Sequence, residues 1–217
     1  MRASGSLNDG GSSVLEPVSV AEALKEALRQ AVALLERQGY RYAVIGGIAN
    51  QRWGRARFTY NVDIKVLVPD TDYPAARAAI RSAFPERARP HVPANPLIVD
   101  AKVAGVSVDF LLAVPGYEEN IVTRAVRGNL DGLEVWICSP EDLVIQKAVA
   151  GRVQDWQDIE GILIEQHGRL NLAYVEDWLR QFTAALDQPE ILSRYQSVQK
   201  RITAELARLT ATNAFSK

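Results

Sequence analysis

Two apolar runs in the first third of the chain predict a pair of central strands. The first, residues 42–45, ends at Gly46 and Gly47, which is typical of a buried strand followed by a sharp turn. In the second, residues 62–68, apolar side chains alternate mainly with charged ones, which indicates a strand with one wet or functional face. Residues 48–54 predict a short helix, so strand, glycine pair, helix and strand follow in order.

The remaining pattern predicts helices on both sides of these strands in the sequence. Ser19 and Glu22 form a capping box that opens a long amphipathic helix. Ser139 and Pro140 are the N-cap and first-turn proline of another helix. The further segments expected are a helix over 73–84, a proline-rich bend over 85–96 that shapes the rim of a cleft, a hairpin over 97–112, a strand over 133–138, and helices over 156–166, 172–186 and 190–209.

These elements predict an α/β (α+β) fold, a small mixed sheet flanked by helices, which are expected on one side of it. Residues 1–16 are rich in Gly, Ser and Asn, as in a flexible arm. Residues 17–165 are expected to form the main domain, and residues 166–217 a C-terminal helical segment that closes a cleft. At 217 residues, nearly half of them apolar, the chain is long enough to bury one good core.

Composition and charge argue against several kinds of function and structural feature. With 25 Lys and Arg against 26 Asp and Glu, the formal charge of −1 argues against broad nucleic-acid coating, although a local patch of Arg52, Arg55 and Arg57 could contact an RNA end. The single cysteine, Cys138, excludes an intramolecular disulfide; it is expected to be half-buried, with no catalytic or zinc-binding pattern around it. No segment resembles a signal peptide or a membrane span, so a soluble, cytoplasmic protein is expected.

The two strands carry the residues with the clearest chemistry. Gly46 and Gly47 let a ligand approach main-chain N–H groups, and the positive end of the following helix favours a phosphate there. Asn61 and Asp63 are two residues apart, so their side chains emerge on one strand face and can converge on a cation such as Mg²⁺. Taken singly, each motif has a plainer explanation, a tight turn for the glycines and a solvated strand edge for the Asn-x-Asp.

In combination, the motifs resemble the core signature of the nucleotidyltransferase (polymerase β-like) superfamily, most of all its branch of AbiEii-type toxins and minimal nucleotidyltransferases. The resemblance covers residues 40–165. It implies that Gly46 and Gly47 hold a triphosphate and that Asn61 and Asp63 occupy the positions of two metal-binding aspartates. It also matches Arg57 and Thr59 to the basic and hydroxyl positions just upstream of that strand.

Later residues follow the order of the same family. Asp109 lies in an apolar strand, where a carboxylate is costly unless it is paired or metal-bound, and it matches a third acidic position. Without the resemblance, a salt bridge at the sheet rim would explain Asp109, and a surface ion pair would explain Lys147 and Asp155. The resemblance implies catalytic roles for Asp63, Asp109, Lys147 and Asp155, with Asp158 as a second possibility for the last. It implies phosphate binding by Gly46, Gly47, Arg57, Thr59, Lys147 and Arg152, and metal binding by Asn61, Asp63 and Asp109.

One residue departs from the family pattern. Asn61 has no negative charge, although its amide oxygen can still ligate a cation. Its presence leaves three possibilities open: an active enzyme, a weakened enzyme or a one-metal site, and a nucleotide-binding pseudoenzyme.

The function expected is transfer of a nucleotidyl group from an NTP, with Mg²⁺ or Mn²⁺, to an acceptor hydroxyl. In the branch resembled, the acceptor can be a tRNA 3′ end or a protein, and a cognate antitoxin is a common partner. Two other functions are consistent with the sequence: a non-catalytic module that binds a nucleotide or a partner protein, and a nucleotidyltransferase acting on small molecules.

Overall fold

The computed structural model describes residues 20–214, with side chains over residues 21–209. The helices are α1 (Val20–Arg37), α2 (Gly46–Trp53), α3 (Tyr73–Ala83), α4 (Tyr117–Thr123), α5 (Pro140–Ala150), α6 (Val153–Glu165), α7 (Leu172–Leu186) and α8 (Glu190–Ala214), with a short 3₁₀ turn, η1 (Pro69–Thr71). The strands are β1 (Arg41–Ile45), β2 (Asn61–Leu67), β3 (Ile98–Val103), β4 (Val106–Leu112), β5 (Val126–Leu130) and β6 (Leu133–Ile137).

These strands form one mixed sheet in the order β3-β4-β2-β1-β6-β5. The pairs β2 with β4 and β1 with β6 are parallel, and the other neighbours are antiparallel. The register places Asp63 of β2 opposite Ile45 of β1 on one side and Asp109 of β4 on the other. Asp100 of β3 lies opposite Asp109, so one row across four strands holds three carboxylates and leads into Gly46.

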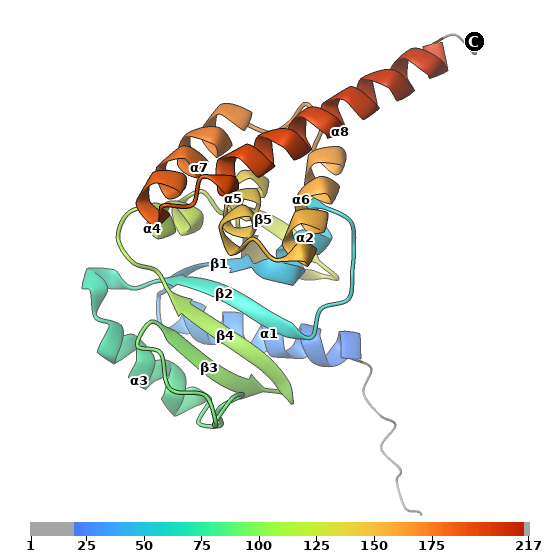
Figure 1. The fold of residues 1–217 in the computed structure, drawn as a ribbon. Helices are drawn as coiled ribbons and strands as arrows, with labels where there is room; N and C mark the ends of the chain where they lie inside the picture. The colour runs from blue at the N-terminus through green and yellow to red at the C-terminus, as the bar shows by residue number, and fades with distance from the viewer. Residues whose placement is uncertain (1–19, 215–217) are drawn as a thin grey trace, which may run out of the picture.

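Helices cover both faces of the sheet (Figure 1). On one face lie α1, which contacts four strands, and α3, which contacts β3. On the other lie α2 and α4, with α5 and α6 behind them, and α7 and α8 pack on α5 and on each other. The prediction of helices on one side is therefore wrong. Because the β2 residues Val62, Ile64 and Val66 are fully buried, the face opposite Asp63 also needs an apolar cover, which α1 provides.

The fold class predicted from the sequence, a small mixed sheet flanked by helices, is confirmed. The helix expected after Ser19 begins at Val20, although Ser19 itself and the arm over residues 1–16 lie outside the described residues. Cys138 is fully buried just after β6, where half-burial was expected. No helix within residues 20–214 is long and apolar enough to cross a membrane.

Candidate active site

A cleft with a volume of about 950 Å³ opens between the sheet and the helices α5 and α6. All ten residues given a catalytic, phosphate-binding or metal-binding role from the sequence line it: Gly46, Gly47, Arg57, Thr59, Asn61, Asp63, Asp109, Lys147, Arg152 and Asp155. They come from segments more than 100 residues apart in the chain, so it is the fold that brings them together.

The glycine pair forms the first turn of α2, and at each glycine a neighbouring side chain occupies the space that a Cβ atom would need. A Cβ on Gly46 would lie 2.3 Å from the Oδ2 atom of Asp63, and one on Gly47 would lie 2.5 Å from the Oγ1 atom of Thr59. Gly46 also has a φ of +64°, in the left-handed region that favours glycine. Ile45 at the N-cap offers no side-chain hydrogen bond to the first-turn N–H groups of α2.

Two carboxylates, those of Asp63 and Asp109, lie side by side on β2 and β4. Burial, together with the negative charge of Asp109, raises the pKa of Asp63 to about 6, and a hydrogen bond from Asn61 opposes the shift. In that bond, Asn61 Nδ2 donates to Asp63 Oδ1 at 2.8 Å. The Oδ1 atom of Asn61 accepts from Thr59 Oγ1 at 3.3 Å. Asn61 therefore stabilises the carboxylate of Asp63 through a hydrogen bond. An ionised aspartate at position 61 would instead repel Asp63.

The donor set fits a single hard cation. Within residues 20–214, no group of three or more His, Cys, Asp or Glu side chains is arranged to hold a metal ion. The oxygen atoms that could hold a cation here are those of the Asp63 and Asp109 carboxylates and, after an amide rotation, the Oδ1 atom of Asn61. Burial, and after it the negative charge of Asp109, disfavours the ionised form of Asp63, so a cation between the two carboxylates would be favoured.

Arg89 is a cleft residue that the sequence did not reveal. It lies in the segment between α3 and β3, and its Nη2 atom is 2.6 Å from the Oδ1 atom of Asp109. This salt bridge agrees with the alternative explanation for Asp109, although β4 is an inner strand of the sheet. The proline-rich bend expected over residues 85–96 thus contributes a cation to the cleft lining.

At one side of the cleft, an ionic network joins α5, α6 and the segment after α2. Lys147 Nζ donates to Asp158 Oδ2 at 2.5 Å and lies 3.6 Å from Asp155 Oδ1. Arg57 donates to both oxygens of Asp158, each at 2.8 Å. The side chains of Lys147, Asp155 and Asp158 are 5%, 3% and 4% exposed, so the alternative of a surface ion pair is wrong. Arg152 donates to Asp155 at 2.6 Å, at the start of α6.

Asp158 is the centre of this network. Although burial opposes ionisation, hydrogen bonds from Arg57 and Lys147 hold the pKa of Asp158 below its ordinary value. Asn50 of α2 also donates to it, at 3.3 Å. Asp158 does not line the cleft, so it fixes the two cations from behind, whereas Asp155 reaches the cleft itself. The spacing of the two aspartates in the sequence did not distinguish these two positions.

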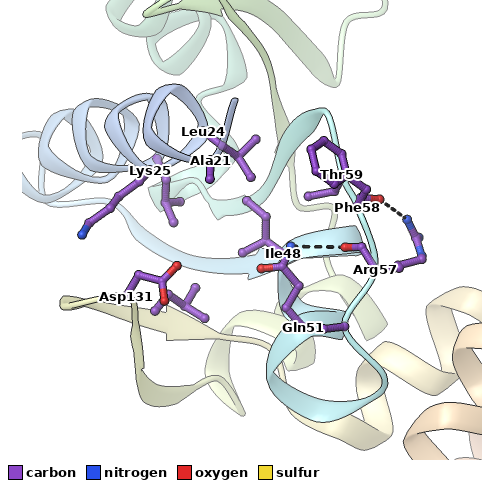
Figure 2. A pocket seen from close by; sticks show the side chains of 12 residues that line it. Ala21, Leu24, Lys25, Ile48, Gln51, Arg57, Phe58, Thr59 and Asp131 are labelled. Atoms are coloured by element: carbon purple, nitrogen blue, oxygen red, sulfur yellow. Dashed lines mark hydrogen bonds between the residues drawn. The ribbon is translucent and has the colours of Figure 1, made fainter. Parts of the chain in front are cut away.

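A second, mostly apolar pocket has a volume of about 340 Å³ (Figure 2). Its lining includes Ala21 and Leu24 of α1 and Ile48 of α2. Phe58 and Thr59 line both cavities, so this segment separates them. Because the carboxylates of Asp63 and Asp109 line only the larger cavity of these two, the cleft is the candidate active site.

Comparisons with known proteins place the chain in a family. A family model described as "Nucleotidyl transferase of unknown function (DUF2204)" matches residues 24–203. A nucleotidyltransferase-like antigen from Paracoccidioides brasiliensis is similar in structure, with 17% identity, a TM-score of 0.47, and coverage of 80% of this chain and 91% of that one.

The antibiotic-resistance factor ANT(2″)-Ia is similar at 15% identity and a TM-score of 0.45, covering 87% of this chain and 96% of its own. No curated protein matches the sequence. Because the family model spans most of the chain, the protein belongs to the DUF2204 family of nucleotidyl transferases.

Proposed function

We propose that this protein transfers a nucleotidyl group from an NTP, bound with Mg²⁺ or Mn²⁺, to an acceptor hydroxyl. The observation that carries the proposal is the shared row of the sheet, where the first turn of α2 lies against Asp63 and Asp63 lies beside Asp109. A phosphate site and a cation site in direct contact are what a metal-bound triphosphate requires. The family membership supports the same type of transfer.

In this proposal each residue acts on charge or position. The N–H groups of Gly46 and Gly47 bind phosphate oxygens, and Thr59 holds Asn61. Lys147 and Arg152 bring positive charge to the phosphates from α5 and α6, where Asp155 and Asp158 orient them. The acceptor hydroxyl loses its proton to water as its oxygen bonds to the α-phosphorus, and the bond to the leaving pyrophosphate breaks. Positioning and charge neutralisation supply most of the catalysis in such transfers.

Asp63, Asp109 and the amide oxygen of Asn61 would hold the divalent cation. When bound, such a cation offsets phosphate charge and polarises the phosphoryl oxygens. The carboxyl groups of Asp63 and Asp109 must then be ionised. Because burial raises the pKa of Asp63 to about 6, we expect cation binding to weaken as the pH falls through this range.

We propose a single-stranded RNA 3′ end as the acceptor. Phe58 and Tyr60 are 63% and 74% exposed, with ring centroids 5.1 Å apart, and both line the cleft. Exposed aromatic rings beside a cationic cleft are suited to stacking on nucleobases. An RNA acceptor agrees with the resemblance to AbiEii-type toxins, in which a cognate antitoxin would be a further partner. Residues 17–165 would then carry the chemistry, and residues 166–217 would support α5 and α6 from behind.

The aromatic pair gives a test of the acceptor. Replacing both residues, as Phe58→Leu with Tyr60→Leu, should reduce labelling of RNA 3′ ends, because stacking contributes roughly 1–3 kcal/mol per base. Labelling is measured with an NTP that carries label on its α-phosphate. Trp136→Leu is the matched control, since Trp136 is partly exposed on β6, outside the cleft lining. Equal labelling by the wild type and the double variant would exclude the stacking role.

The general function is tested by a transfer screen. Purified protein is incubated with each of the four NTPs, labelled on the α-phosphate, in Mg²⁺ or Mn²⁺, with total RNA, cell-extract proteins or small hydroxyl compounds. Stable label on RNA supports the proposal, and label on small molecules alone would favour the small-molecule transferase instead.

Asn61 gives one specific reason to keep a second candidate, a nucleotide-binding module without activity. Its amide engages Asp63 where the family pattern has a carboxylate. NTP binding without transfer by the wild type, together with transfer by Asn61→Asp, would establish this second function.

A further inference from the structure

The cleft has fewer carboxylates than the resembled family pattern, and it holds an arginine against one of those that remain. Because position 61 is an asparagine, only the carboxylates of Asp63 and Asp109 remain of the three acidic positions in that pattern. The guanidinium of Arg89 lies 2.6 Å from the carboxylate of Asp109. We infer that Arg89 supplies the second positive charge of this site, so that the carboxylate pair takes one divalent cation together with an arginine. The inference rests on the proposed function, because it concerns how the same site binds a nucleotide triphosphate.

Arg89 is anchored from behind. Its backbone N–H donates to Asp100 Oδ2 at 2.9 Å, and Arg87 donates to Asp100 Oδ1 from Nε and Nη2 at 3.1 and 3.0 Å. Asp100 is buried on β3, opposite Asp109 in the register. The carboxylate of Asp100 therefore fixes the backbone at Arg89, and the side chain of Arg89 reaches the neighbouring carboxylate, that of Asp109. Such an anchored contact differs from an exposed pair, which contributes little.

The net charge of the site in this arrangement equals that of a site with two divalent cations and three carboxylates. Two divalent cations on three carboxylates leave a net charge of plus one to meet the phosphates. One divalent cation and one guanidinium on two carboxylates leave the same plus one. Two divalent cations here, with Arg89 in place, would leave plus three. The loss of the carboxylate at position 61 and the presence of Arg89 therefore offset each other.

Arg89 can also contact the nucleotide. A guanidinium carries five N–H donors in a planar fork that suits phosphate oxygens. The Nη2 atom binds Asp109, and the side chain is 39% exposed at the cleft, so further donors can face a ligand. Arg89 would thus bridge Asp109 and a phosphate, as a second metal ion does in two-metal sites. The ligand class is the phosphate chain of a metal-bound NTP.

Counting bound Mn²⁺ tests the inference without requiring turnover. Electron paramagnetic resonance measures free Mn²⁺ as the protein is titrated in the presence of α,β-methylene analogues of the four NTPs. The wild type should bind one Mn²⁺ per chain with the analogue. Arg89→Ala should still bind one, but its affinity for the analogue should fall by about tenfold or more, because a charge-assisted contact is lost. Arg89→Lys should recover part of this loss.

The double variant Asn61→Asp with Arg89→Ala is the sharper arm, since it restores a third carboxylate and removes the arginine. It should bind two Mn²⁺ per chain. Arg127→Ala is the matched control, because Arg127 packs on Trp136 outside the cleft lining. Circular dichroism of every variant verifies folding.

Three results would overturn the inference. Two Mn²⁺ on the wild type would exclude a one-metal site while leaving the proposed function intact. A rise in the affinity of Arg89→Ala for Mn²⁺ and the analogue would show that Arg89 competes with the cation. If the wild type binds no analogue with Mn²⁺ at all, the proposed function fails as well, and the two failures are thereby distinguished.

Discussion

Asp63 illustrates how single residues set the properties of the cleft. Its carboxylate packs against Gly46 so closely that any side chain there would collide with it, and burial raises its pKa to about 6. The Asn-x-Asp spacing predicted that Asn61 and Asp63 share a strand face, which follows from strand geometry. The contact with Gly46 could not be predicted, because it depends on how β1 and β2 are aligned.

Gly46→Ala should therefore abolish nucleotide binding. The new methyl group would enter the space of Asp63 Oδ2, 2.3 Å away, and the left-handed φ of +64° would add strain of about 1–2 kcal/mol. Binding of a Mn²⁺–NTP analogue is measured by calorimetry. Gly105→Ala is the control, since Gly105 has a φ of +80° but open space within 4 Å of the place its new methyl group would take. It should lose similar stability and keep its affinity; retained affinity in Gly46→Ala would contradict the packing account.

At the scale of elements, strand register and helix packing bring the site residues together. Alternation within residues 62–68 and 106–112 predicted strands with functional faces, but only the parallel pairing of β2 with β4 places Asp63 beside Asp109. Arg89 was missed because its contact depends on an anchor, Asp100, on a third strand. A helix was predicted over residues 156–166, and α6 begins three residues earlier, at Val153. The buried contacts of Asp158 with α5 and with the segment after α2 could not be predicted, because they depend on the fold.

Asp158→Asn should destabilise the protein and weaken its pH dependence. Removing this carboxylate leaves Lys147 buried without its main partner, which typically costs about 3 kcal/mol. Because the folded-state pKa of Asp158 lies below the ordinary 3.8, its contribution is fully present well above pH 3.8 and is lost as the pH falls through the folded-state value.

Urea unfolding at pH 7 and pH 3 measures this prediction. The difference in unfolding free energy between the two pH values should be larger for the wild type than for Asp158→Asn. Glu160→Gln on the same helix is the control, since the pair of Glu160 with Arg201 is exposed and should contribute less than about 1 kcal/mol. Equal stability of Asp158→Asn and the wild type at pH 7 would exclude the structural role of the network.

At the scale of the whole molecule, the sequence predicted the fold class and most elements, because long periodic segments carry strong signals. It did not reveal α4 or β5, which are short, and it placed the helices on one side of the sheet. Short elements carry weak periodic signals, whereas the covering of both sheet faces depends on contacts between distant segments. The near-neutral formal charge of −1 gave no sign that four cationic side chains gather at one cleft. These are Arg57, Arg89, Lys147 and Arg152, which come from four separate segments.

The central claim is that this cleft transfers a nucleotidyl group with the help of Asp63. The most direct test compares the wild type with Asp63→Asn, which preserves size and removes the charge. Each is given α-phosphate-labelled NTP, Mg²⁺ or Mn²⁺ and total RNA, and label on the RNA is counted after precipitation. The account predicts label with the wild type and background counts with Asp63→Asn. Equal labelling by both proteins would contradict it.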